Sequence, residues 1–308
     1  MNKILSGMLV FGLMSLPVAA DRVITKSFDI ASGGTLEVTT DIGAIEVDTH
    51  SGDGVSLTVE IIGLDDDEFE VSFNTSGDTL KVDGDKTSSS WSWGSNKVRF
   101  EISVPQQFDL NLRTAGGSIR VDDIKGKVDV KTSGGSLRFG NVEGPINGKT
   151  SGGSISIDGA KGDVMVKTSG GSLTLGDIQG DVVGRTSGGS INLGVINGEA
   201  DVATSGGSIR IKEAQGRLSA RTSGGSVDVS FVGQLTGDSD IATSGGSITA
   251  RLPEDIKATI YARGNRIKSD FTIDGVTSAK RRLKGDINGG GAEIKLQTSS
   301  GNVYLEEK

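Results

Sequence analysis

A six-residue motif, Thr-Ser-Gly-Gly-Ser-Ile or a close variant, recurs along the middle of this chain at a nearly constant interval. Successive copies begin 18 residues apart six times and 21 residues apart once. Self-similarity at a short fixed period is typical of proteins built from stacked repeats. We number each 18-residue unit from its threonine, and the eight units begin at Thr114, Thr132, Thr150, Thr168, Thr186, Thr204, Thr222 and Thr243.

Apolar residues alternate with polar ones in two short segments of each unit. Positions 6 and 8 are apolar in one segment, and positions 15 and 17 are mostly apolar in the other. This period of two predicts strands that bury one face. Two such strands fill most of a unit and leave no room for a helix. The residues at position 6 are Ile119, Leu137, Ile155, Leu173, Ile191, Ile209, Val227 and Ile248.

One unit alone cannot bury its apolar face, whereas units stacked about 4.8 Å apart form continuous apolar columns joined by backbone hydrogen bonds. The sequence therefore predicts an all-β fold, a parallel β-solenoid of 18-residue repeats in which the position-1 threonine faces inward. The Gly-Gly pair predicts a tight corner with positive φ and close backbone approach. We expect right-handed winding, because a left-handed hexapeptide solenoid needs apolar residues at positions 12 and 18, which here are mostly polar or basic.

The regions on either side of the repeats keep the alternation but lose the motif. We expect residues 21–113 to form an irregular N-terminal β cap, residues 114–250 the regular repeats, and residues 251–308 a C-terminal β cap, all within one domain. "TSSGNVYL" from Thr298 is a degenerate copy of the repeat.

Residues 1–20 have the pattern of a cleaved signal peptide. Lys3 precedes an apolar run from Ile4 to Leu16, and Val18-Ala19-Ala20 fits a cleavage site. The alternative, a membrane anchor, needs about 20 apolar residues. We therefore expect an exported protein, in the periplasm or outside the cell, without a transmembrane anchor.

Composition excludes several classes of protein. The chain has 308 residues, a formal net charge of −8, no cysteine and one histidine. Without a basic surplus we expect no nucleic-acid partner. The absence of cysteine rules out disulfides and thiol catalysis, and nothing in the sequence indicates a cofactor or a metal site.

Position 18 carries a row of cations that we take as the candidate binding face. The row is interrupted at Ala203, and it consists of Lys131, Lys149, Lys167, Arg185 and Arg221. Cations about one rung apart repel one another unless acids or an anionic partner offset them. The expected partner is an unidentified protein or an acidic glycan of the envelope. The alternative is a charged face that keeps the protein soluble, neutralised by Asp129 or Asp163.

Three further groups of residues need a structural test. Trp91 and Trp93 could stack on a sugar or protein partner, or pack over the N-terminal cap. "KRRLK", residues 280–284, is a second basic patch. Asp122 and Asp123, near Arg120 and Arg138, are the best local candidates for carboxylate catalysis, although adjacent aspartates at a strand end are more often solvated turn residues.

The sequence also resembles a known family. "VRFEISVPQQFDLNLRTAGGSI", the run of "TSGGSI" units and "LKGDINGGGAEIKLQTSSGNVYLEE" are similar to the bacterial putative-adhesin family of β-strand-repeat envelope proteins, in the toast-rack group of domains of largely unknown function. The resemblance covers about residues 25–306 and implies a β-solenoid in the cell envelope without established catalytic residues.

The function we expect is a non-catalytic envelope protein, adhesin-like or a scaffold, that presents a rigid binding face. The alternatives are a carbohydrate-active β-helix enzyme, either a polysaccharide lyase or a hydrolase, and a periplasmic sensor or scaffold for envelope stress. The oligomeric state is left open by the sequence.

Overall fold

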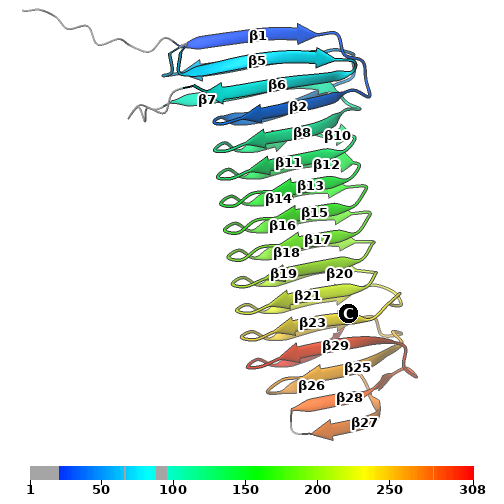
Figure 1. The fold of residues 1–308 in the computed structure, drawn as a ribbon. Helices are drawn as coiled ribbons and strands as arrows, with labels where there is room; N and C mark the ends of the chain where they lie inside the picture. The colour runs from blue at the N-terminus through cyan, green and yellow to red at the C-terminus, as the bar shows by residue number, and fades with distance from the viewer. Residues whose placement is uncertain (1–20, 66, 88–95, 280) are drawn as a thin grey trace, which may run out of the picture.

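The computed structural model describes residues 21–308 except residue 66, residues 88–95 and residue 280, and the signal peptide expected at residues 1–20 lies outside the described residues. The elements of the described residues are all strands, which form two 15-stranded sheets stacked along one axis (Figure 1). No helix among these residues is long and apolar enough to cross a membrane. The all-β prediction is therefore confirmed.

Each repeat contributes one strand to each sheet, and strands of successive repeats pair in parallel. In sheet A the regular strands are β9 (Ile119–Val121), β12 (Leu137–Glu143), β14 (Ile155–Ala160), β16 (Leu173–Ile178), β18 (Ile191–Ile196), β20 (Ile209–Ala214), β22 (Val227–Phe231) and β24 (Ile248–Leu252). In sheet B they are β8 (Asp109–Thr114), β11 (Val128–Thr132), β13 (Ile146–Lys149), β15 (Val164–Lys167), β17 (Val182–Arg185), β19 (Ala200–Thr204), β21 (Leu218–Thr222) and β23 (Ser239–Thr243). A two-residue strand, β10 (Ile124–Lys125), pairs beside β12.

The register of sheet A confirms the predicted apolar columns. Leu173 is aligned with Ile155 on one neighbouring strand and with Ile191 on the other, and all three are fully buried. Thr174, the next residue, is exposed. The buried residues form a single core cluster that extends from Ile30 to Leu305. The solenoid of 18-residue rungs is thus confirmed, and its right-handed winding stays a prediction.

The position-1 threonines face inward, as predicted, and tie each corner to the preceding one. The Thr168 hydroxyl donates a hydrogen bond of 2.7 Å to the carbonyl oxygen of Gly153, and it accepts one of 3.4 Å from the N–H of Gly171. The same pair of bonds recurs at Thr132, Thr150, Thr186, Thr204, Thr222 and Thr243.

The Gly-Gly corner is tight, but the positive φ expected there is wrong: neither Gly170 nor Gly171 has one. The second glycine is needed for close approach instead. A Cβ on Gly171 would lie 2.2 Å from the carbonyl oxygen of Gly153 in the preceding rung, whereas one on Gly170 would lie 3.1 Å from that of Gly152. The corner bends through ordinary backbone angles, and stacking of adjacent rungs excludes the side chain.

At the N-terminal end, the order of rungs in space differs from their order in sequence. The rung of β2 (Thr35–Thr40) and β3 (Ala44–His50) lies between the β8–β9 rung and an outer rung of β6 (Thr79–Lys86) and β7 (Lys97–Pro105). Antiparallel strands cover this end: β1 (Arg22–Phe28) and β4 (Val55–Ile62) in sheet A, and β5 (Phe69–Ser76) in sheet B.

The C-terminal end has the same kind of inversion. The chain first forms an outer rung, β25 (Ala258–Arg263) and β26 (Ile267–Ser269), and an antiparallel pair, β27 (Asp274–Ala279) and β28 (Arg282–Ile287). It then returns, so that β29 (Ala292–Thr298) lies between β23 and β25, and β30 (Val303–Glu307) lies between β24 and β26. Thr298 bonds to Gly246 at 2.7 Å, which confirms the degenerate copy of the repeat.

Candidate binding face

The outer face of sheet B carries the row of cations predicted at position 18. Lys131, Lys149, Lys167 and Arg185 are aligned on four consecutive strands, and Ala203 and Arg221 follow on the next two. Arg113 on β8 is aligned with Lys131 and extends the row by one rung, a member that the sequence analysis missed because it lies just before the first motif.

The arginines of this row are neutralised by a simple rule. Each one pairs with an aspartate at position 16 of the next rung, 16 residues later in the chain or 19 where the spacer is longer. Arg113 lies 3.7 Å from Asp129, and Arg221 lies 2.7 Å from Asp240. Arg185 makes the corresponding ion pair and hydrogen bond with Asp201.

The three lysines between these arginines have no such partner. Sixteen residues after Lys131, Lys149 and Lys167 the chain has Asn147, Met165 and Val183, none of which is acidic. Among the described residues, none forms an ion pair or side-chain hydrogen bond with these three ammonium groups. We call Lys131, Lys149 and Lys167, all exposed, the lysine row.

The two acids considered as neutralising partners are engaged elsewhere. Asp129 pairs with Arg113 and accepts a hydrogen bond of 2.8 Å from the side-chain amide of Asn147. Asp163 accepts a hydrogen bond of 3.0 Å from the backbone N–H of Asp181. Position 18 is thus neutralised wherever it is arginine and left without a counter-charge wherever it is lysine.

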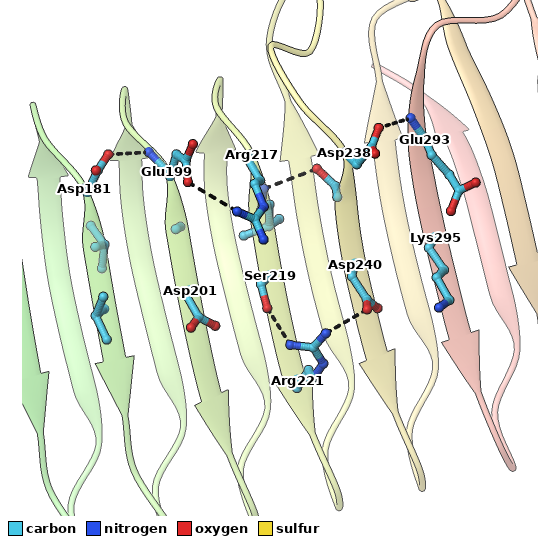
Figure 2. Close-up of a pocket in the computed structure, with 15 residues that line it drawn as sticks. Asp181, Glu199, Asp201, Arg217, Ser219, Arg221, Asp238, Asp240, Glu293 and Lys295 are labelled. Carbon is cyan, nitrogen blue, oxygen red and sulfur yellow. Dashed lines mark hydrogen bonds and ion pairs between the residues drawn. The ribbon is translucent and has the colours of Figure 1, made fainter.

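A second feature of sheet B is a shallow hollow of about 530 Å³ toward the C-terminal end (Figure 2). Most of its carboxylates already have partners. Asp181 accepts a hydrogen bond of 2.8 Å from the N–H of Glu199, Asp238 accepts one of 2.8 Å from that of Glu293, and Glu199 lies 3.7 Å from Arg217. The figure shows these groups bridging adjacent rungs, which is a structural use of the charges.

Glu143 lies between two lysines at the opposite edge of the rungs, where the chain passes from sheet A to sheet B. Its carboxylate is 3.1 Å from the ammonium of Lys161 and 3.6 Å from that of Lys125. The hydrogen bond from Lys161 and the charges of both lysines lower the pKa of Glu143 below its ordinary value. This ion bridge joins three consecutive rungs.

The carboxylates considered for catalysis do not form a reaction centre. The Asp123 carboxylate accepts two hydrogen bonds from Asn141, 2.6 Å from its backbone N–H and 3.1 Å from its side-chain amide, and so joins two rungs. Arg120 and Arg138 are aligned on neighbouring strands of sheet A. The described residues contain no cluster of three or more His, Cys, Asp or Glu side chains that could hold a metal.

The remaining candidates lie at the two ends. Trp91 and Trp93 lie outside the described residues, and so does Lys280 of the second basic patch. In that patch Arg282 and Lys284 are exposed on β28, whereas Arg281 donates hydrogen bonds to Asn265 and to the carbonyl oxygen of Ser299.

The sequence already contained the signal that separates paired from unpaired cations. In a parallel solenoid with 18-residue rungs, position 18 of one rung and position 16 of the next lie diagonally across two strands. Reading each cation against the residue 16 positions later would have identified Arg113 and Arg185 as paired and the lysine row as unpaired.

Comparison with solved structures finds the same fold at low identity. A putative adhesin from Parabacteroides merdae is 13% identical, with 92% of this chain and 96% of the other covered and a TM-score of 0.42. A putative lipid binding protein from Parabacteroides distasonis is 16% identical, with the same coverage and a TM-score of 0.41. A putative adhesin from Bacteroides fragilis is 12% identical, with 92% and 97% covered and a TM-score of 0.29.

Among curated proteins the sequence finds no match. The family model described as Toastrack DUF4097 matches residues 35–306, which includes every regular rung and both inverted ends. The chain therefore belongs to the Toastrack DUF4097 family.

Proposed function

We propose that this protein is an exported, non-catalytic component of the cell envelope that acts as an adhesin or scaffold, and that the outer face of sheet B is its binding face. The partner we propose is an anionic component of the envelope, in the first place an acidic glycan.

The observation that carries this proposal is the lysine row. Three exposed ammonium groups on adjacent strands, about 4.8 Å apart, are closer than a Debye length and repel one another. The same face neutralises Arg113, Arg185 and Arg221 with aspartates, so an acid at position 16 is available to this architecture. Leaving three consecutive cations without one favours an external anion as their counter-charge.

The rigidity of the face supports the same proposal. Each lysine lies in a strand that is hydrogen-bonded on both sides, so the spacing of the row is fixed before a ligand arrives. Binding then requires no ordering of the backbone, and only the lysine side chains lose freedom. A long, regular face of this kind suits attachment to a polymer better than enclosure of a small molecule.

Retention on an immobilised acidic polysaccharide tests the proposal. The wild type should be retained on polygalacturonate at low salt and eluted by raising the salt, because exposed ion pairs are screened. A variant with Lys131, Lys149 and Lys167 replaced by Gln should pass through. A control with Lys212, Lys257 and Lys268 replaced by Gln carries the same net charge and should be retained like the wild type. Equal retention of the two variants would show that net charge, not the row, governs binding.

The proposed location is tested separately by fractionation. The protein should be recovered in the periplasmic, surface or secreted fraction, with its N-terminus at Asp21 after cleavage of residues 1–20. Recovery in the cytoplasm with Met1 retained would contradict export, whatever the result of the binding experiment.

A further inference from the structure

A row of unused hydroxyl groups runs alongside the lysine row. Each corner of the repeat has hydroxyls at positions 1, 2 and 5, and two of the three are used within the corner. Thr168 donates to Gly153, and the Ser154 hydroxyl accepts a hydrogen bond of 3.2 Å from the N–H of Ser172. The position-2 hydroxyl of Ser169 is exposed and makes no hydrogen bond to another described residue.

The same division holds along the repeats. The position-5 serines accept bonds from the next rung at Ser118, Ser136, Ser154, Ser172, Ser190, Ser208 and Ser226. The position-2 residue is serine in seven consecutive units although no bond of the corner uses its hydroxyl. We call this set the serine row, and it consists of Ser133, Ser151, Ser169, Ser187, Ser205, Ser223 and Ser244.

The two rows coincide over three rungs only. Each lysine is followed two residues later by a serine of the row, as in Lys167 and Ser169, and side chains two residues apart on extended backbone lie on the same side. The regular corners that carry the serine row form one edge of the stack, next to sheet B (Figure 1). Arg113 precedes Ala115 instead of a serine, and Arg185 is already paired with Asp201.

From this coincidence we propose that the lysine row and the serine row together bind a linear polyuronate, which lies parallel to the solenoid axis with one sugar per rung over three rungs. The inference rests on the binding face proposed above and adds the class, the direction and the length of the ligand. A chain lying across the strands meets all three lysines, whereas a chain lying along one strand would meet only one of them.

The chemistry of the two rows fits a uronate better than a simple polyanion. Each ammonium group can pair with the carboxylate of one sugar, and each serine hydroxyl can both donate to and accept from ring hydroxyls. Met165, between the second and third lysines along the chain, is 51% exposed and offers an apolar contact to the C–H face of a sugar ring. A polyphosphate has neither hydroxyls nor an apolar face to use these groups.

The length of the ligand is the first test. Calorimetry with galacturonate oligomers of one to six sugars should show affinity rising about two- to fivefold with each sugar up to three, the size of one exposed ion pair per step. Beyond three sugars the affinity should change by less than about twofold. Affinity that keeps rising by the same factor to six sugars, or that does not depend on length, would overturn the three-rung site.

The serine row is the second test, and the chain supplies its own control. Replacing Ser133, Ser151 and Ser169 by Ala should weaken binding of the trimer by about two- to tenfold and leave binding of tripolyphosphate within about twofold. Replacing Ser205, Ser223 and Ser244 by Ala removes the same groups from rungs without free lysines and should change neither affinity. Equal effects of the two variants, or an equal loss for both ligands, would overturn the uronate assignment.

The outcomes separate this inference from the function on which it rests. If the variant with all three lysines replaced by Gln is still retained on polygalacturonate, the binding face itself is wrong. If that variant loses retention while oligomer length and the serine row have no effect, the face binds anions and the axial uronate site is wrong.

Discussion

The hydroxyl of Thr168 reaches into the preceding rung, where it donates a hydrogen bond of 2.7 Å to the carbonyl oxygen of Gly153. Thr168 is 1% exposed, so this carbonyl loses its partner if the hydroxyl is removed. Replacing Thr168 with Val keeps the shape and should lower the free energy of unfolding by about 1–3 kcal/mol, measured by chemical denaturation. Ser169→Ala, which removes an exposed hydroxyl without a bond, should cost less than about 0.5 kcal/mol. Similar costs at the two positions would contradict the role of the threonine.

The two corner glycines should respond differently to alanine. A Cβ at Gly171 would meet the backbone of Gly153 at 2.2 Å, and a backbone atom cannot move aside without separating the rungs. A Cβ at Gly170 has 3.1 Å to the nearest atom and needs only a small shift. We expect Gly171→Ala to lower the free energy of unfolding by about 1–3 kcal/mol more than Gly170→Ala. If Gly170→Ala is the more damaging of the two, the close-approach explanation fails.

The alternation of buried and exposed residues along a strand can be tested at two consecutive positions. Leu173 packs between Ile155 and Ile191 in the core, and truncation to Ala should cost about 2–5 kcal/mol of stability because it leaves a cavity. Thr174→Ala, one residue later and facing outward, should cost less than about 0.5 kcal/mol. Thermal and chemical denaturation of the two variants provide the measurement, and equal losses would contradict the assigned faces.

Glu143 gives a prediction on pH. Its pKa is lowered in the folded state by the hydrogen bond from Lys161 and by the charges of both lysines. A lowered folded pKa means that the ion bridge contributes its stability above the unfolded pKa of about 4.3 and loses it as pH falls through the folded value. An NMR titration should place the midpoint of Glu143 below that of an ordinary glutamate, and Lys161→Gln should raise it. A midpoint unchanged by Lys161→Gln would show that the bridge is not formed in solution.

The regular part of the fold follows from the sequence because its period equals one turn of the solenoid. Once the unit is 18 residues, residue 155 must lie over residue 173, and the alternation decides which side chains face the core. The inward threonine follows from the same count, since it lies two residues after the buried position 17. The predicted row at position 18 follows as well, because a register of 18 aligns Lys131 with Lys149.

The two ends could not be derived in this way. The strand from Val303 to Glu307 has an alternation that suits any rung of the stack, and nothing in its residues requires it to return between β24 and β26. The corner glycines show a similar limit. Composition indicates that a side chain is excluded, but whether positive φ or the backbone of the neighbouring rung excludes it depends on how closely the rungs stack.

The position of the last two strands gives the molecule a mechanical polarity. β1 has a single partner, β4, so force applied at Arg22 can unzip it one hydrogen bond after another. β30 is held by β24 on one side and β26 on the other, so force applied at Glu307 along the strand must shear two ladders at once. A rod with this construction yields first at its N-terminal edge, and a load carried through its C-terminal strand is shared with the repeats.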